Sequence, residues 1–328
     1  STTEESSAAS DVYKRQAPGL IEVPAANLET GMYVAELDRP WLDAPFAVQG
    51  FYVMSRDDVD FVAEHCAYVY VDPRRRSSGQ ELATSPRPRR TYRNRTTLKQ
   101  ELETAQTDLT SANGTMEAVF EKLKTGGHLN VKVVKSAISP LIESVLRNSE
   151  AIGALVRMKK KGDYLYGHSI AVAVWAGILG RQLGLARDQL EQLALGGALI
   201  DIGMASIDDS LTAAPNKLAR DELKQIQSQV PLGVELLKAS GDLSKNVIDM
   251  VASHHERHDG SGYPQGLSET EIPMFARVAG LVDSYDAMIT SRPYAVSRSS
   301  FEAMQELADL KGKLFQDALL EQFMQAVG

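Results

Sequence analysis

The chain has 328 residues, 43% of them hydrophobic, and is therefore long enough for one large domain and a second, smaller one. Its net charge of −8 argues against general binding to nucleic acid or to a membrane surface. The single cysteine, Cys66, excludes an intramolecular disulfide and a cysteine-rich zinc site, and no apolar run reaches the roughly 18 residues of a membrane helix.

The first residues of the chain are small and polar, so we expect a disordered tail over residues 1–19. This tail lacks the apolar core of a secretory signal. Together with the single cysteine, which fits a reducing compartment, it favours a cytoplasmic protein.

Strand patterns follow the tail. The runs LIEV, MYVAEL, FAVQGFYVM and AYVYV are typical of short strands and are separated by turn-forming proline and glycine. Ser55 is placed to cap a helix over residues 56–65, with Asp57 and Asp58 in its first turn. We therefore predict a small α+β domain over residues 20–75.

A basic linker is predicted at residues 76–96. The stretch 74–95 contains eight arginines and no apolar periodicity. It fits a patch for nucleic acid or an acidic partner, or else a solvated hinge. One short basic stretch in an acidic chain is weak support for the patch, so we favour the hinge and expect no nucleic-acid partner.

The rest of the chain has helical periodicity, and we predict an all-helical domain over residues 97–328, which makes the protein mainly α. A first segment at 97–125 is expected to break near Asn113–Gly114. It could form a homodimer seam or pack on its own domain, and the sequence leaves both open. Further helices are predicted at 131–147, 150–160, 164–183, 187–202, 219–239, 243–256, 272–290 and 299–325.

Ionisable side chains lie on helix faces that are otherwise apolar. His168 shares its face with Trp175, and Asp201 and Asp283 lie on faces with small residues. Asp286 is interpreted as a structural partner for the backbone. Each residue alone is more often a hydrogen-bonded core group than a ligand, but a buried carboxylate needs a partner or a metal.

A histidine pair, His254 and His255, ends an apolar helical segment and precedes a glycine-rich loop. At a helix end both imidazoles can turn toward neighbouring metal ions, as a two-metal hydrolase requires. Imidazole and carboxylate ligands without thiolate suit iron, manganese or zinc. Together with the inward-facing groups, this pair predicts a metal site.

The segment HHERHDGSGYPQGL, residues 254–267, resembles the signature loop of the HD-GYP family, helical metal-dependent phosphodiesterases that hydrolyse cyclic di-GMP in bacteria. The resemblance runs from about residue 162 to residue 294 and includes DYLYGHS around His168, APNKL at 214–218 and RPY at 292–294. Residues 20–75 are similar to the small domain of unknown function that often precedes HD-GYP domains.

Four positions depart from the family pattern. The family's His-Asp pair, followed by Ile-Gly-Lys, reads IDIGM here, so Ile200 replaces the histidine and Met204 the lysine. Val230 replaces the histidine of a His-Pro pair, and Ala295 stands where a basic residue is usual.

The resemblance implies which residues bind metal. One ion would be held by His168, Asp201 and Asp283, and the other by Asp201, His254 and His255, with Asp201 and Asp283 as the catalytic carboxylates. Each ion loses one imidazole, because isoleucine and valine have no lone pair to offer. We therefore expect at most one weakly bound divalent ion (iron, manganese or zinc), and the absence of any metal stays an open alternative.

The resemblance also implies a ligand site. Tyr263 and Arg292 remain as contacts for cyclic di-GMP, whereas Met204 and Ala295 remove two cations that would neutralise its phosphates. We expect a catalytically impaired HD-GYP protein that acts as a regulatory or binding module with a protein partner. The alternatives are an active phosphodiesterase with a reduced metal site and a purely structural protein that dimerises through residues 97–125.

Overall fold

The computed structural model describes residues 19–46, 50–76, 89–158, 164–212, 219–241, 243–290 and 297–328. The chain divides into two compact units, residues 1–88 and 89–328. Residues 1–18, most of the expected tail, lie outside the described residues. None of the described helices is long and apolar enough to cross a membrane.

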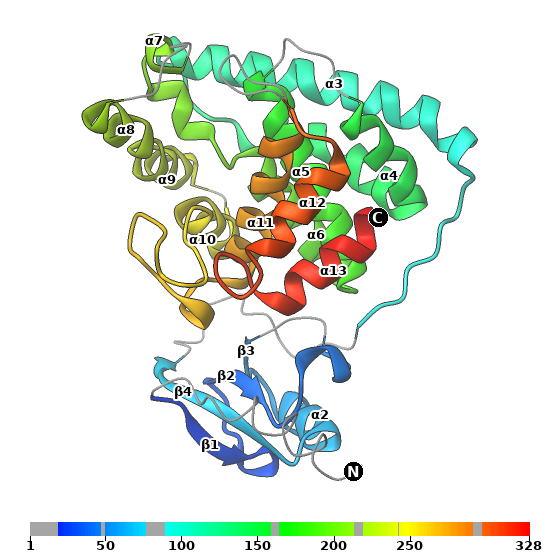
Figure 1. The fold of residues 1–328 in the computed structure, drawn as a ribbon, viewed down its shortest axis with the longest axis vertical. Helices are drawn as coiled ribbons and strands as arrows, with labels where there is room; N and C mark the ends of the chain where they lie inside the picture. Colours follow the sequence, from blue (N-terminus) through cyan, green and yellow to red (C-terminus); the bar gives the residue numbers. More distant parts are fainter. Residues whose placement is uncertain are drawn as a thin grey trace. The chain divides into compact units, whose positions relative to one another are not determined.

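The first unit contains a four-stranded antiparallel sheet with strand order β1-β4-β2-β3 (Figure 1). Its elements are β1 (Ile21–Pro24), the 3-10 turn η2 (Ala25–Asn27), β2 (Met32–Leu37), η3 (Trp41–Asp43), β3 (Phe51–Tyr52), helix α2 (Arg56–His65) and β4 (Tyr68–Arg76). The Ser55 hydroxyl accepts from the Asp58 N–H, and the Asp58 carboxylate accepts in return from the Ser55 N–H, which closes a capping box. The predicted small α+β domain is confirmed.

The only cysteine belongs to this unit and is inert there. Cys66 follows α2 and is 4% exposed. Burial, reinforced by the charge of Asp38, raises the pKa of the Cys66 thiol to about 12, so the reactive thiolate is scarce at neutral pH.

Every named element of the second unit is a helix, as predicted. They are α3 (Leu98–Lys124), α4 (Val131–Arg157), α5 (Tyr164–Gln182), α6 (Arg187–Ala198), η4 (Ile202–Ser206), α7 (Asp209–Thr212), α8 (Arg220–Gln227), α9 (Gln229–Ser240), α10 (Lys245–Ser253), η5 (Glu269–Glu271), α11 (Met274–Ile289), α12 (Ser300–Asp309) and α13 (Asp317–Val327).

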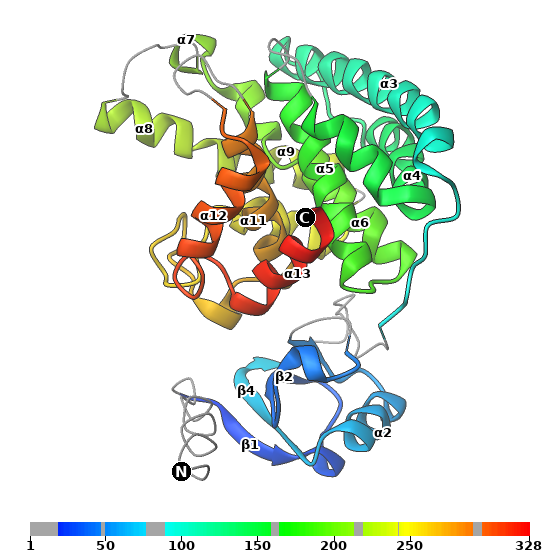
Figure 2. The same cartoon turned by 45° about the vertical axis from the view of Figure 1, so that its right-hand side comes forward.

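Helix α5 is the centre of this unit. Residues 167–180 are all buried, as expected for a helix that is apolar on every side. It contacts α3, α4, α6, α11 and α13, which surround it in Figures 1 and 2. A functional side chain on α5 therefore lies deep in the domain.

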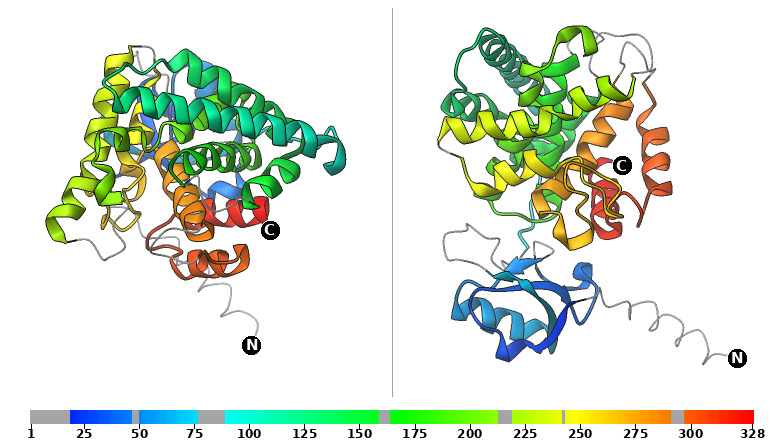
Figure 3. Two further views of the ribbon diagram at one scale, coloured as in Figure 1. Left: turned by 90° about the horizontal axis from the view of Figure 1, so that it is seen from above. Right: turned by 90° about the vertical axis from the view of Figure 1, so that its left-hand side faces the viewer.

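Helices α3 and α4 pack side by side, as two views of the unit show (Figure 3). The apolar face of α3, which includes Leu109, Met116 and Phe120, is buried. Packing on its own domain, one of the two alternatives for this segment, therefore accounts for that face. The expected break at Asn113–Gly114 is wrong, because α3 continues through it.

The helix end predicted at residue 147 is confirmed, because the backbone of Asn148 is non-helical and kinks α4 there. The Asn148 side chain accepts from the Ala151 N–H and donates to the Thr96 carbonyl. Other helix boundaries differ from the sequence prediction. The segments expected at 219–239 and 299–325 are each divided into two helices, α8 with α9 and α12 with α13. Apolar periodicity continued across these turns, so it did not locate them.

The end of the predicted linker lies against the helical unit. The Arg90 N–H donates to the Gly184 carbonyl, the Tyr92 hydroxyl to the Leu185 carbonyl at 2.7 Å, and the Arg95 N–H to a carbonyl of α4. Residues 89–95 are therefore held by the turn that joins α5 to α6 and by α4.

Candidate metal centre

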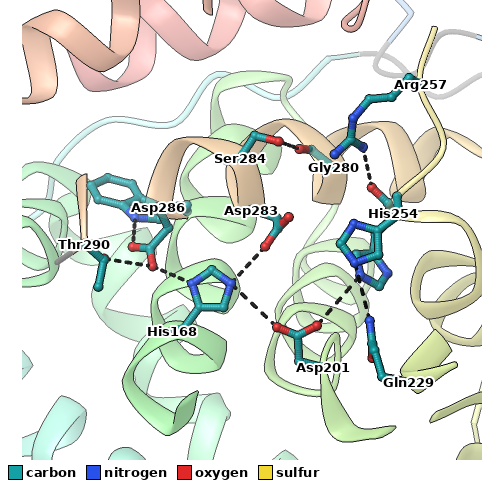
Figure 4. Close-up of polar contacts among 12 residues, drawn as sticks. His168, Asp201, Gln229, His254, Arg257, Gly280, Asp283, Ser284, Asp286 and Thr290 are labelled. Carbon is teal, nitrogen blue, oxygen red and sulfur yellow. Dashed lines mark hydrogen bonds and ion pairs between the residues drawn. The ribbon is translucent and has the colours of Figure 1, made fainter. Parts of the chain in front are cut away.

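Two groups of potential metal ligands meet at the centre of the helical unit (Figure 4). One is His168, Asp201 and Asp283; the other is Asp201, His254 and His255. In each group the donor atoms lie within 4.8 Å of one another, and Asp201 belongs to both. The structure thus brings together all five residues proposed as ligands, from α5, the end of α6, the end of α10 and α11.

Small residues let these elements approach closely enough. A Cβ atom at Gly197 of α6 would lie 2.7 Å from the backbone of Ala173 in α5. At Gly280 of α11 it would lie 2.6 Å from the carbonyl oxygen of His254. Both contacts are too short for any side chain, so glycine permits backbone-to-backbone packing where the ligands converge.

Asp201 does not lie on a helix face, contrary to the sequence prediction. Helix α6 ends at Ala198, and Asp201 is in the turn that starts η4, where its carbonyl accepts from the Met204 N–H. A tighter 3-10 turn replaces the α-helix there. The side chain of Asp201 is 18% exposed and faces His168 and His254.

His168 is held on both ring nitrogens. Nε2 lies 2.8 Å from Asp283 and 3.7 Å from Asp201, and Nδ1 lies 2.7 Å from Asp286. Although burial disfavours the imidazolium, the hydrogen bonds to Asp283 and Asp286 raise the pKa of His168 to about 10. In the absence of metal, a proton on His168 therefore balances the surrounding carboxylates, and a cation would compete with it.

The pKa of Asp283 is shifted in the opposite direction to that of His168. Burial alone would raise its pKa, but the hydrogen bond and charge of His168 outweigh that effect and hold the pKa of Asp283 well below its usual range. The group is a carboxylate at neutral pH, as a metal ligand must be.

Asp286, interpreted from the sequence as a structural partner for the backbone, is placed by the structure behind His168. Its carboxylate accepts from His168, from the Trp175 indole N–H at 3.1 Å and from the Thr290 hydroxyl at 3.3 Å. Asp286 is fully buried. A carboxylate behind a histidine fixes the tautomer and orientation of the ring, an arrangement typical of metal-binding histidines.

His254 offers a direct test of whether a cation fits. Its Nδ1–H donates to the Val251 carbonyl at 2.8 Å, so in the neutral imidazole Nε2 carries the lone pair. Nε2 is buried, has no hydrogen-bond partner among the described residues, and lies 3.9 Å from an oxygen of Asp201. A cation between this nitrogen and the Asp201 oxygen would bind both acceptors, so the site fits a metal ion.

His255 completes the second group. Its ring stacks on that of Tyr263, with centroids 4.6 Å apart and planes at 24°, and its Nε2 lies 3.4 Å from the amide nitrogen of Gln229. Burial lowers the pKa of His255 well below its usual value. A neutral imidazole is the form that binds metal.

The loop after the histidine pair is held by Glu256, which the sequence prediction did not single out. Its carboxylate accepts from the backbone N–H groups of Gln265 at 2.7 Å and Leu267 at 3.0 Å. The Tyr263 N–H donates to the His255 carbonyl at 3.2 Å. These bonds hold the phenol of Tyr263 beside the proposed ligands. Burial, aided by the charges of Asp201 and Asp283, raises the pKa of Tyr263, so its hydroxyl is protonated at neutral pH.

The structure describes three of the four positions that depart from the family pattern. Ile200 and Val230 are 0% and 1% exposed, so both apolar side chains are buried. Met204 is half-buried in η4. Arg292 and Ala295 lie outside the described residues.

The comparisons with known proteins agree with the geometry. A family model described as HD domain matches residues 143–319, and one described as a domain of unknown function, DUF3391, matches residues 20–134. The cyclic di-GMP phosphodiesterase PA4108 of Pseudomonas aeruginosa is 30% identical over 322 residues, which cover 94% of this chain and 77% of that protein.

Other similarities are partial or concern the fold. The cyclic di-GMP phosphodiesterase response regulator RpfG of Xanthomonas campestris is 37% identical over 150 residues, which cover 44% of this chain and 40% of RpfG. The solved structure of Bd1817, an HD-GYP-type protein from Bdellovibrio bacteriovorus, covers 93% of this chain and 98% of its own, with a TM-score of 0.56 and 15% identity. That likeness supports the arrangement of helices and the small sheet.

Proposed function

This chain belongs to the HD-domain family, in its HD-GYP group, and we propose that it is a cyclic di-GMP signalling protein whose hydrolytic activity is impaired and which serves as a regulatory or binding module. What supports the proposal is the burial of Ile200 and Val230, two apolar residues that stand, by the resemblance to the family pattern, where each ligand group would have an imidazole. Loss of one ligand in about four weakens the binding of first-row metals strongly.

The residues that would hold metal are His168, Asp201 and Asp283 for one ion and Asp201, His254 and His255 for the other. The ligand set suits manganese, iron or zinc. A bound ion would polarise a phosphate oxygen and supply a nucleophilic hydroxide from water.

The chain's own groups prepare the site. Asp286 fixes His168, and Glu256 folds the loop that presents Tyr263. The protonated Tyr263 hydroxyl is a hydrogen-bond donor suited to a phosphate oxygen. Binding of cyclic di-GMP therefore requires fewer intact positions than its hydrolysis does.

The proposal is tested by purifying the protein, measuring bound metal, and incubating it with cyclic di-GMP and manganese or iron. We expect linear pGpG or GMP to appear about 100-fold or more slowly than with an intact HD-GYP enzyme assayed alongside, because ligands and phosphate cations are missing. Product formed at the rate of the intact enzyme would refute the impairment.

A second candidate is an active phosphodiesterase with a reduced metal site. The convergence of five ligands favours it, because Asp201 still joins both groups. In that case Asp201→Ala should abolish turnover. Activity that survives this substitution would come from a contaminant and not from this site.

A structural role without ligand binding is the third possibility, with a protein partner or a second copy bound through residues 97–125. Calorimetry separates it from a sensor. We expect binding heat with micromolar cyclic di-GMP, and its absence would favour the structural role.

A further inference from the structure

The first residue of α9, Gln229, is a buried polar group with an unexplained atom. It is 2% exposed, and its Oε1 has no hydrogen-bond partner among the described residues. The other atom of the amide, Nε2, points at His255 from the α9 side of the site (Figure 4). A buried, unpartnered amide oxygen costs about 1–3 kcal/mol, so its retention needs a reason.

The position of Gln229 is fixed by the same packing that places Asp201. Helix α9 contacts η4, and the backbone carbonyl of Gln229 lies against Gly203, where no Cβ could be accommodated. Gly203 is in the short turn that begins at Asp201. The side chains of Gln229 and Asp201 therefore approach the histidine pair from adjoining segments.

We infer that the Gln229 amide oxygen is a ligand for the ion held by Asp201, His254 and His255, and replaces the imidazole missing at the next position, Val230. A half-turn of the terminal amide exchanges Oε1 and Nε2, which brings the oxygen to the place that lies 3.4 Å from His255 Nε2. In a tetrahedral site, two donor atoms that each lie about 2.1 Å from the ion are about 3.4 Å apart. This separation matches the distance between the Gln229 amide and His255 Nε2.

This inference rests on the metal site of the proposed function and deepens it. An amide oxygen is a harder and weaker donor than an imidazole, and carbonyl oxygen suits manganese whereas imidazole suits zinc and iron. The second ion is therefore bound more weakly than in a site with the full histidine set, and with a preference shifted from zinc toward manganese.

A simpler role would be positioning: the Gln229 N–H₂ group would donate to His255 and never contact a metal. The two roles predict opposite effects for Gln229→Glu. A carboxylate keeps an oxygen ligand and adds negative charge, so metal binding is retained or strengthened. It removes the donor, so a positioning role would be lost.

The test measures manganese and zinc binding by calorimetry and elemental analysis on the full chain and on Gln229→Ala, Gln229→Glu and Gln225→Glu. Gln225 lies on the exposed surface of α8 and is the matched control. We expect the wild-type chain to bind manganese at the group of Asp201, His254 and His255. Gln229→Ala should weaken that binding about 10- to 100-fold, and Gln229→Glu should bind manganese at least as tightly as wild type.

Three outcomes would overturn the inference: unchanged manganese binding in Gln229→Ala, loss of manganese binding in Gln229→Glu, or no manganese binding by the wild-type chain. Thermal unfolding in EDTA checks that each variant is folded, and if Gln229→Ala fails this check, Gln229→Glu decides. Turnover of cyclic di-GMP is measured separately: a fast wild-type enzyme refutes impairment but leaves the ligand role of Gln229 intact.

Discussion

Behind His168, which we propose as a metal ligand, a second set of contacts fixes the orientation of the ring. Asp286 accepts from His168 and also from the indole of Trp175, so both residues would act on metal binding without touching the ion. Outer hydrogen bonds of this kind typically change metal affinity about 10- to 100-fold.

We therefore expect Trp175→Phe, which keeps an aromatic ring but removes the N–H donor, to weaken manganese binding, and Asp286→Asn to weaken it further. The chain contains two tryptophans, which supplies a matched control: Trp41→Phe in the first unit should leave affinity unchanged. Isothermal titration with manganese checks this. Equal affinity in wild type and Trp175→Phe would contradict the positioning role.

Restoring the missing imidazoles is the complementary experiment. The double substitution Ile200→His with Val230→His should raise metal affinity about 10-fold or more, because each ligand group regains a donor. Metal content and hydrolysis of cyclic di-GMP are measured on the same preparation. Metal regained without hydrolysis would implicate the lost cations at Met204 and Ala295. No gain in metal would show that the ligand geometry itself has changed.

For single residues, the sequence indicated which side chains form the candidate site but not which other side chains they contact. The proposed ligands meet in space, because charged groups that face inward on apolar helices must be paired or must bind a metal. The contacts of Asp286 with His168 and Trp175 were not predicted, since sequence spacing cannot show that these residues reach it from another helix. Gln229 gave no signal beyond a polar residue in the middle of the predicted helix 219–239.

Between elements, the close approach of α11 to the end of α10 depends on Gly280. A methyl group there would lie 2.6 Å from the His254 carbonyl oxygen, so Gly280→Ala must separate the two segments. We expect the free energy of unfolding to fall by about 1–3 kcal/mol, with weaker metal binding because Asp283 and His254 move apart.

Gly114 is the matched control for that substitution. It lies in α3, and a methyl group added there would have no atom within 4 Å. Gly114→Ala should therefore stabilise the protein by about 0.5–1 kcal/mol, because alanine is the better helix former. Denaturant titrations of both variants test this, and a Gly280→Ala variant as stable as wild type would exclude the close-packing argument.

Helix identity was predictable from apolar periodicity, whereas helix ends were not. The break expected at Asn113–Gly114 did not occur, because the buried face of α3 outweighs the low helix propensity of one glycine. Asp201 falls beyond the end of α6, where close packing at Gly197 and the following 3-10 turn redirect the chain. Tertiary contacts set these boundaries, and local sequence does not record them.

For the whole molecule, metal binding and folding are linked. The ligands come from segments far apart in the sequence, so an ion that binds only the folded chain stabilises it. With free manganese at about 100 times its dissociation constant the gain is about 2.7 kcal/mol.

We expect the melting temperature to rise with manganese and to return to its initial value in EDTA. Asp201→Ala removes a ligand from both groups and should cancel the rise. Calorimetric scans at several metal concentrations provide the measurement. A rise that persists in Asp201→Ala would place the bound metal elsewhere.

The division of the chain into units illustrates what the sequence could and could not tell. The change from strand pattern to helical pattern predicted a small α+β region and a helical one, and both are confirmed. The compact units part at residue 88, whereas the match to the domain of unknown function extends to residue 134. The match to the domain of unknown function therefore includes α3, although α3 belongs to the second compact unit.

The hydrogen bonds by which Glu256 holds the loop after the histidine pair bear on how members of this family are recognised from sequence. Its carboxylate holds two backbone N–H groups of the loop whether or not a phosphate bond is ever cleaved. These hydrogen bonds stabilise the loop independently of catalysis. A match to the loop therefore does not by itself indicate hydrolytic activity, which in our proposal depends on positions outside the loop such as Ile200 and Val230.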